Sequence, residues 1–540
     1  MSVKSRRRES RTANARLSAD VALIVLLLSV LISPTACRRQ SKQMRFTKPI
    51  VFRISGSSTS ARQYAGVIQN YLEQVGIPVD IQPSELTTML DQLRYGQFQM
   101  TYGQWVGGNQ DPIFYKDLFA SSEIPTQTRA ARNRSRYENN ELDAILNEAV
   151  NTYDHAKAAP LYSRAQEIVS RDVPVFPLWY QANMVIAKKG VGNIHINASG
   201  DWGFIKDLTL DGSRLVIALS DNVKTIDPIG SPSVDAASER VRTLMFNSLV
   251  KKDDKFDYVP ELASKIDRSE DGLTFTFTLR DGVTFHDGRP FTSADAKYTL
   301  DTVLASTFAK AASFFEGSGA SRTSFIKSVE APGAHTLIVR LNRPWTGLLP
   351  NLVAIAMIPK DSYESQKTHP LGTGPFKFKN YDQAQQVVDM EANTTYWDGA
   401  SKIAALRVRV ISDSNALQAE LQSGRVDIAP LPTSLSPDSI KLLGSNPNLN
   451  LHQFEGSNLN LLTFNTKEAP LDNVKVRQAI AYAIDRESLI RELLQGQGKI
   501  AHSILPEGSW AYTQGRTYHF DPSMARKLLD EAGFRAPGGN

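Results

Sequence analysis

Residues 273–300 read LTFTFTLRDGVTFHDGRPFTSADAKYTL, and they combine strand, turn and helix signals. The first seven residues alternate between apolar and polar side chains, which is typical of a half-buried β-strand. Asp281-Gly282 and Asp287-Gly288 predict turns on either side of a second, shorter strand. Thr292 or Ser293 is then placed to cap a helix. The stretch therefore predicts two strands followed by a helix.

The chain before this stretch shows a different pattern. Apolar runs at 51–54, 78–82 and 98–102 predict three strands. A helix is expected over 61–74, and a second helix is expected to begin after a cap at Ser84. This βαβαβ order predicts an α/β lobe in which helices cross between parallel strands.

The same alternation of short apolar runs and amphipathic segments continues to the end of the chain. The final helix has Asp521 as its cap, Pro522 in its first turn and Gly533 after its end. Further helices are expected at 141–151, 155–170, 475–494 and 522–532, and further strands at 175–186, 215–219, 336–341, 386–390 and 405–411.

Length and composition are those of an ordinary globular protein. The 540 residues suggest three or four domains at about 150 residues each. Apolar residues make up 41% and charged residues 22%. Cys37 is the only cysteine, which excludes an internal disulfide and any site built from several cysteines.

The net charge of +5 does not belong to the folded body. Residues 1–43 hold nine basic and two acidic side chains, a local charge of +7, which leaves the rest of the chain at −2. The charge of the body therefore gives no support for nucleic-acid binding. We expect no nucleic-acid partner.

Residues 1–43 have the order of a secretory signal, a basic region followed by an apolar run at 21–32. Twelve residues would span about 18 Å as a helix, which is short of a membrane's apolar core of about 30 Å. Small residues then precede Cys37, as in a bacterial lipobox, so we expect lipidation of Cys37. The alternative is plain signal cleavage that leaves Cys37 as a free thiol.

Motifs of common catalytic sites are absent from the sequence. There is no HExxH, no GxxxxGK[ST] and no GxSxG. The eight histidines are scattered, and no pair has the spacing of metal ligands. We therefore predict no enzyme activity, no catalytic residues, no metal and no cofactor.

The quoted stretch resembles the signature of the family 5 bacterial extracellular solute-binding proteins, which serve ABC importers of dipeptides, oligopeptides and nickel. Other segments from residue 215 onward agree with this resemblance. They are Asp227-Pro228, Gly372-Thr373-Gly374-Pro375-Phe376, Asn393 with Tyr396-Trp397, Gly424-Arg425-Val426-Asp427-Ile428, and the run from Asp472 to Asp485.

Residues 44–210 also resemble this family, but they resemble its C-terminal part. Gly103-Gln104-Trp105 through Asp111-Pro112 is similar to the family's ligand-cleft segment, and residues 173–178 (VPVFPL) to a strand near its C-terminus. The order of segments is therefore signal, C-terminal part, N-terminal part, which resembles a circular permutation joined near residues 210–211. The alternative is a protein in ordinary order that only looks rearranged.

The resemblance implies a periplasmic-binding-protein-like α/β fold of cluster C type, with two hinged α/β lobes and an extra α+β domain in permuted order. The expected divisions are 1–43 as signal and leader, 44–189 plus 476–540 as the C-terminal ligand-binding lobe, 190–257 plus 371–475 as the N-terminal lobe, and 258–370 as the extra domain. His286 lies in the extra domain, where we expect a structural role.

The resemblance also implies function. We expect a monomer on the periplasmic face of the cell envelope, held by a lipid anchor. It would capture peptides or a similar solute between its lobes and deliver them to an ABC permease in the inner membrane. An oligosaccharide or metal-chelate binder of the same fold is one alternative, and an envelope enzyme or chaperone-like protein is another.

The expected ligand-binding residues follow the family's cleft segment. The acid that anchors a peptide's α-amino group in the family corresponds to Gly108, so that acid is missing. Asp111 is a substitute or a structural turn residue, and Trp105 is a cleft wall or a packing residue. The residues expected to line the site are Trp105, Gly107, Gly108, Asn109 and Asp111, with Ser57, Ser58 and Thr59 either capping a helix or binding a carboxylate.

Overall fold

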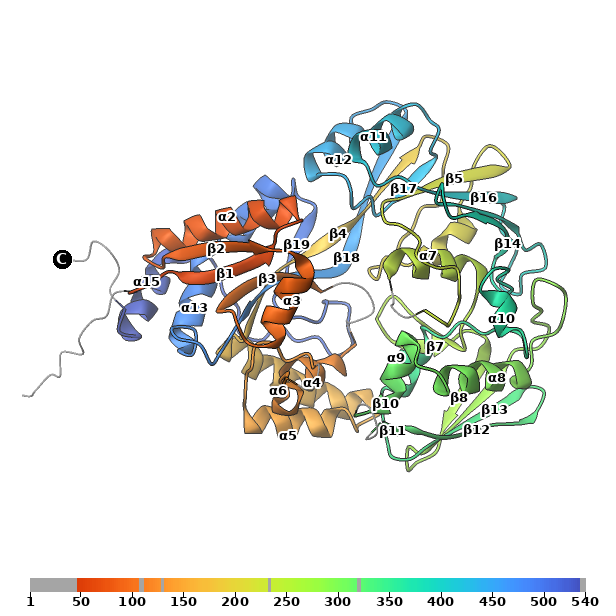
Figure 1. The fold of residues 1–540 in the computed structure, drawn as a ribbon, viewed down its shortest axis with the longest axis horizontal. Helices are drawn as coiled ribbons and strands as arrows, with labels where there is room; N and C mark the ends of the chain where they lie inside the picture. The colour runs from red at the N-terminus through yellow and green to blue at the C-terminus, as the bar shows by residue number, and fades with distance from the viewer. Residues whose placement is uncertain (1–45, 106–110, 128–130, 232–234, 318–321, 535–540) are drawn as a thin grey trace, which may run out of the picture.

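The computed structural model describes residues 46–105, 111–127, 131–231, 235–317 and 322–534. These residues form one broad sheet with helices packed against it and a smaller sheet at one side (Figure 1). The mixture of parallel and antiparallel strands with helices confirms the predicted α/β class.

The broad sheet has eleven strands. In order across the sheet they are β14 (Phe376–Asp382), β15 (Val387–Ala392), β16 (Ala405–Val410), β5 (Arg214–Leu219), β17 (Ile428–Pro430), β4 (Val175–Lys188), β18 (Leu449–Phe464), β3 (Met100–Trp105), β1 (Ile50–Ser55) and β2 (Val79–Ser84), with β19 (Gly498–Ile500) paired to β4. Neighbouring strands therefore come from distant parts of the chain.

The first three strands have the predicted parallel βαβαβ arrangement. β1 pairs in parallel with both β2 and β3. The connecting helices are α2 (Thr59–Gln74) and α3 (Leu86–Arg94). α2 begins after Ser58, whose side chain accepts a hydrogen bond from the backbone N of Ala61.

The start of α3 differs from the prediction. Ser84 does not cap this helix, because its pairing with Ser55 keeps it extended as the last residue of β2. The cap is Glu85, whose Oε2 accepts hydrogen bonds from the backbone N of Thr87 (2.7 Å) and Thr88 (3.2 Å). A carboxylate at this position also interacts favourably with the positive end of the helix dipole.

The two longest strands, β4 and β18, connect the two halves of the broad sheet. Residues 449–454 of β18 lie opposite residues 183–188 of β4, where β17 is the next strand. Residues 458–463 of β18 lie opposite residues 175–181 of β4, where β3 and β19 are adjacent. The register shifts where the two stretches meet, so the pair crosses from one half of the sheet to the other at that point.

The backbones are closely packed at this crossing. A Cβ on Gly456 would lie 2.0 Å from a carbonyl oxygen of β4, so only glycine fits there. Asn183 Nδ2 donates to the carbonyl of Asn197 (2.8 Å), and the backbone N of Ser457 donates to the carbonyl of Ala198 (2.9 Å). The segment at 197–198 therefore makes hydrogen bonds to both strands where they cross.

The stretch at 273–300 contributes to the smaller, four-stranded antiparallel sheet. Its strands, in order, are β12 (Ile326–Gly333), β13 (Thr336–Leu341), β9 (Thr274–Leu279) and β8 (Ala263–Arg268), with α8 (Ser293–Leu304) nearby. The predicted second strand is reduced to an isolated bridge between Thr284 and Pro290. Thr292 caps α8 and forms a capping box with Asp295.

Eleven further α-helices and two small two-stranded sheets also occur in the described residues. α15 has the predicted cap at Asp521, and Gly533 follows it with a φ of +90°. The helices are α4 (Phe114–Phe119), α5 (Asn140–Ala149), α6 (His155–Asp172), α7 (Ala236–Met245), α9 (Leu348–Leu352), α10 (Tyr363–Gln366), α11 (Ser414–Gln422), α12 (Pro437–Gly444), α13 (Val474–Ala483), α14 (Arg486–Ser488) and α15 (Pro522–Glu531), and the two-stranded sheets are β6 (Val250–Lys252) with β7 (Tyr258–Pro260) and β10 (Phe315–Glu316) with β11 (Thr323–Ser324).

The single helix predicted over 475–494 is broken. α13 ends before Ile484, whose backbone is extended (φ −95°, ψ 116°), and Asp485 caps the short α14. The break places Arg486 in the interior, where its guanidinium donates to the backbone carbonyls of Pro177, Ala501 and Tyr518. These long-range contacts explain why helical periodicity alone did not reveal the break.

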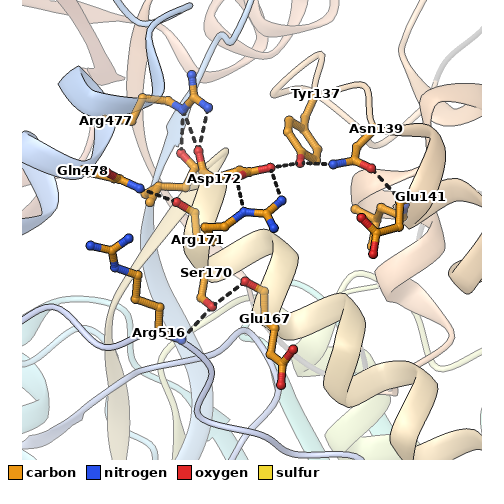
Figure 2. A network of polar contacts seen from close by, with 12 residues as sticks. Tyr137, Asn139, Glu141, Glu167, Ser170, Arg171, Asp172, Arg477, Gln478 and Arg516 are labelled. Atoms are coloured by element: carbon orange, nitrogen blue, oxygen red, sulfur yellow. Dashed lines mark hydrogen bonds and ion pairs between the residues drawn. The ribbon is translucent and has the colours of Figure 1, made fainter. Parts of the chain in front are cut away.

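The C-terminal end of α6 is held by side chains from the last part of the chain (Figure 2). The Arg477 guanidinium donates to the carbonyl of Asp172 (2.6 and 2.9 Å) and to that of Val173 (3.1 Å). Gln478 Nε2 donates to the carbonyl of Arg171 (2.7 Å). The last carbonyls of a helix lack partners within it, so these side chains satisfy groups that would otherwise be buried unpaired.

The first and last described parts of the chain also share one apolar core. Buried side chains from β1 and α2 pack in the same cluster as side chains from α13 and α15. The rings of Phe46 and Phe534 stack with centroids 4.4 Å apart. The proposed division into two lobes and an extra domain stays a prediction, because the broad sheet is continuous from one proposed lobe to the other.

Replacing Arg477 tests the joint at the end of α6. We expect Arg477→Ala to reduce stability by about 3 kcal/mol, because it leaves several buried carbonyls without donors. Arg491→Ala is the matched control, since Arg491 is 64% exposed, and it should change stability by less than about 0.5 kcal/mol. Urea unfolding followed by circular dichroism measures both variants, and equal midpoints for the two would contradict this role of Arg477.

His286 predicts a loss of stability in acid. Burial lowers the pKa of His286 to about 4 from an ordinary 6.5. Its Nε2 lies 3.1 Å from the carbonyl of Gly374, and its Nδ1 accepts from the backbone N of Gly372 (3.3 Å), so the folded protein holds the neutral ring. The unfolded chain binds the proton more readily, and this stability is therefore lost as the pH falls from about 6.5 towards 4.

The corresponding variant is His286→Gln, which cannot titrate in this range. Thermal melting of both proteins between pH 7 and pH 4, in steps and at constant ionic strength, measures the difference. Between pH 7 and pH 4, the melting temperature of the native protein should fall further than that of the variant. Parallel curves for the two proteins would show that His286 does not contribute to the pH dependence.

Candidate functional site

The carboxyl ends of β1 and β3 lie at one edge of the broad sheet, because the two strands are parallel. In α/β proteins, ligands bind outside the carboxyl ends of such strands. Trp105 is the last residue of β3, and Ser57 and Ser58 follow β1. The sheet therefore brings these predicted residues to the same edge.

The serine cluster after β1 has a structural role. Ser58 Oγ accepts from the backbone N of Ala61 (3.1 Å) and caps α2. Ser57 Oγ lies 3.0 Å from Ser55 Oγ, and both Ser57 and Thr59 are exposed. The capping alternative is confirmed for Ser58, and binding of a ligand carboxylate here stays a prediction.

Trp105 packs on one face of the sheet as part of a small apolar cluster. The ring is half-buried beside Tyr180, Leu459 and Leu461. Its Nε1 is buried and has no hydrogen-bond partner within the described part of the chain. The apolar neighbours of Trp105 fit a packing role. Most buried indole N–H groups find an acceptor, so an Nε1 without a partner in the described residues also fits a role facing a ligand cleft.

Asp111 joins two parts of the molecule. Its Oδ1 accepts from the backbone N of Ile113 (2.8 Å), as in an Asx turn, and its Oδ2 accepts from the Tyr258 hydroxyl (2.5 Å). Burial raises the pKa of Asp111, against the hydrogen bond from Tyr258 and the charge of Lys252. The structural turn is thus present, and the second oxygen makes a contact that a turn alone would not require.

The remaining predicted site residues lie outside the described residues. They are Gly107, Gly108 and Asn109, and the same is true of the lipidation candidate Cys37. No helix in the described ranges is both long and apolar enough to cross a bilayer. No cluster of three or more potential metal ligands occurs in those ranges.

Several further contacts join the α5–α6 region to the smaller sheet and its loops. The Tyr153 hydroxyl accepts from the backbone N of Trp345 (2.6 Å) and donates to the carbonyl of Gly272 (3.1 Å). Thr346 Oγ1 donates to the carbonyl of Val150 (2.7 Å). Together with the contact between Asp111 and Tyr258, these bonds hold the two parts together.

A cavity of about 490 Å³ lies between these two parts. One wall comes from α5, α6 and Trp510, and the other comes from β7, β8, β9 and α9. Asp111, Tyr162 and Tyr258 line it together with Arg268 and Asp257. Volumes of about 300–1,000 Å³ are typical of small-molecule sites in proteins.

Charged groups that the sequence analysis did not identify interact with one another and, through Lys252, with Asp111. Burial lowers the pKa of Lys252, while the charges of Asp111 and Asp201 act to raise it. Burial also lowers the pKa of Arg240, against Asp221 and Asp201. Asp201 therefore interacts with both cations. Lys252, which acts on Asp111, and the groups linked to it are far from Asp111 in sequence, so no local motif connects them.

Asn460 is a second polar group that the sequence analysis missed. It is 1% exposed, and its Oδ1 accepts from the Tyr102 hydroxyl (2.5 Å) and from Gln104 Nε2 (3.0 Å). Its Nδ2 has no partner among the residues that the structure describes. Buried amide donors usually have one. A polar residue within the apolar run of β18 was the only available signal.

Comparison with known proteins identifies the family. The sequence profile described as bacterial extracellular solute-binding proteins, family 5 Middle, matches residues 257–540, just over half of the chain. Heme-binding protein A of Haemophilus influenzae is 32% identical over 337 residues, which cover 57% of this chain and 59% of that protein. The dipeptide-binding protein of Escherichia coli is 31% identical over 314 residues, which cover 54% of this chain and 58% of that protein.

The chain thus spans less than three-fifths of the length of these curated relatives. The crystal structure of the ABC transporter substrate binding protein CtaP from Listeria monocytogenes aligns with a TM-score of 0.50 and 25% identity, over 60% of this chain and 66% of that one. The matched family consists of binding proteins and not of enzymes. The chain belongs to family 5 of the bacterial extracellular solute-binding proteins.

Proposed function

We propose that the protein is the extracytoplasmic solute-binding component of an ABC importer, and that it captures peptides or a similar solute for delivery to a membrane permease. Family membership supports this proposal, as does the similarity to the dipeptide-binding protein of Escherichia coli. The observation on which it rests is the cavity between two parts of the fold. A buried carboxylate lines this cavity, and several hydrogen bonds join the two parts beside it.

The mechanism follows from the position of the cavity. A ligand in it would touch α5 and α6 on one side and β7–β9 on the other. A ligand shifts a conformational equilibrium only when it binds one state better than the other. Contacts to both walls exist only when the walls are close together, so ligand binding would favour the closed form. The closed form would then dock on the permease.

Location and assembly belong to the same proposal. The basic and apolar order of residues 1–43 supports export, and the small residues before Cys37 support a lipid anchor on the periplasmic side of the membrane. One acyl chain binds a membrane only weakly, so stable anchoring through Cys37 would require more than one. We propose a monomer, since the cavity is formed within a single chain.

We also propose that the chain is a circular permutation of the family's order. The stacked rings of Phe46 and Phe534 show that the first and last described segments are in contact. β5 pairs with β16 and β17, as expected if it begins the N-terminal lobe. Permutation is tolerated when the original termini lie close together at the surface. The lobes would be 44–189 plus 476–540 and 190–257 plus 371–475, with 258–370 as the extra domain.

A rearranged chain tests the permutation. It would begin at residue 212, run to residue 534, continue through a short Gly-Ser linker to residue 46 and end at residue 210. We expect it to fold with the melting temperature of residues 46–534 in their present order, because the same contacts form. Failure of the rearranged chain to fold, while the present order folds, would contradict the proposal.

Ligand-induced thermal shift tests the transport function. A binder gains about 2.7 kcal/mol at a hundredfold excess of ligand over Kd. The panel should contain di- to pentapeptides, oligosaccharides, nickel chelates and heme, so that the alternative ligands are compared directly. We expect peptides to raise the melting temperature most. A panel that gives no shift, with no ligand found by mass spectrometry in the purified protein, would contradict solute binding.

Trp105 tests whether the edge of β3 contributes to binding. We expect Trp105→Ala to weaken binding of the best panel ligand by about tenfold, because the ring area and the Nε1 donor are lost. Tyr95→Ala is the control, since Tyr95 is 45% exposed at the end of α3. Isothermal titration calorimetry measures both. Unchanged affinity in Trp105→Ala would leave packing as its only role.

A further inference from the structure

The cavity between the α5–α6 region and the smaller sheet has an uneven distribution of charge. Its most buried charged group is Asp111, which is 6% exposed. Asp257 also lines it, with its side chain 43% exposed, while Lys265 is 67% exposed. Arg268 is exposed as well. Acidic groups thus lie deeper in the cavity than basic groups.

Aromatic rings form much of the wall around the two carboxylates. Tyr162 and Tyr258 flank Asp111: the Tyr258 hydroxyl donates to its Oδ2, and the Asp111 charge raises the pKa of Tyr162 in addition to the effect of burial. The rings of His155 and Trp510 stack 3.7 Å apart, and both residues line the cavity. Ring faces attract cations, most strongly where water is excluded.

The basic groups at the rim already have partners. Lys265 Nζ lies 2.8 Å from Asp267 Oδ1. The Arg268 guanidinium lies over the ring of Tyr153, 4.2 Å from its centroid. Lys252 offsets part of the Asp111 charge, but it is not among the residues that line the cavity. Two carboxylates and several ring faces therefore line the cavity, and Asp111 is more buried than either Lys265 or Arg268. His155 Nδ1 lies 3.8 Å from Asp257 Oδ2.

We propose that this cavity selects solutes that carry a cationic group, an ammonium or a guanidinium, which binds between Asp111 and Asp257. Arg268, which also lines the cavity, would favour a carboxylate on the same solute. The ligand class is thus a basic amino acid or a short peptide with a lysine or arginine at its C-terminus. This inference rests on the proposed function, because it specifies the solute of the same importer component.

The cavity also links selection to closure. The two carboxylates belong to different walls, Asp111 to the segment before α4 and Asp257 to the β6–β7 hairpin. A cation between them would attract both walls. A basic solute therefore favours the closed arrangement more than a neutral solute of the same shape does.

Matched dipeptides test the charge preference. The probes are Ala-Lys, Ala-norleucine, which lacks the side-chain ammonium but keeps the α-ammonium, and Ala-Lys amide, which lacks the carboxylate. Isothermal titration calorimetry at fixed ionic strength should show Ala-Lys binding about tenfold more tightly than Ala-norleucine, with Ala-Lys amide between them. Equal affinities for Ala-Lys and Ala-norleucine would overturn the inference.

Variants locate the preference. Asp257→Asn should abolish the preference for Ala-Lys, and the amide preserves the acceptor for the Tyr258 backbone N. Asp267→Asn is the control, because Asp267 pairs with Lys265 and does not line the cavity, so the preference should remain. Asp111→Asn removes the other charge, and its amide oxygen can still accept from the backbone N of Ile113. A preference that persists in both Asp257→Asn and Asp111→Asn would overturn the inference.

The outcomes separate the inference from the proposed function. If both dipeptides bind with equal affinity, or larger neutral peptides bind best, peptide binding stands and selection for a cation is wrong. If no member of the earlier solute panel binds and the dipeptides do not bind either, both proposals are wrong.

Discussion

The arrangement of this protein depends on how the C-terminal end of α6 is satisfied. The Arg477 guanidinium and the Gln478 amide donate to carbonyls of residues 171–173, about 300 positions earlier in the chain. A buried carbonyl without a partner costs about 1–3 kcal/mol, so these bonds strongly favour one position for α13 against α6. α6 is followed almost immediately by β4, and α13 packs against α2 in the same apolar core. The same bonds therefore position the half of the broad sheet that carries Trp105.

Local signals predicted local structure well. The alternation at 273–279, the parallel βαβαβ unit and the cap at Asp521 all depend on residues within a few positions of each other, and all three are confirmed. The wrong predictions have non-local causes. Ser84 stays extended because it pairs with Ser55 on a neighbouring strand, and the helix beyond 484 breaks because Arg486 bonds to carbonyls from distant segments.

The candidate site was predicted only in part for the same reason. The family resemblance identified the segment from Trp105 to Asp111. The structure places Asp111 in the lining of the cavity between two parts of the fold, and Trp105 in a small apolar cluster beside Tyr180. The partners of Asp111 could not be read from the sequence, since Tyr258 is 147 positions away and the cavity is lined by several separate segments. Asn460 gave only the signal of one polar residue in an apolar strand.

The paired strands β4 and β18 have a further mechanical consequence. Backbone hydrogen bonds join them on both sides of the crossing, and Gly456 leaves no room for a side chain between them there. Sliding one half of the sheet past the other would break this ladder, so relative movement is confined to twisting and bending of a two-stranded ribbon. Twisting or bending such a ribbon does not change its register. The same pairs of residues therefore meet again each time the two halves come together.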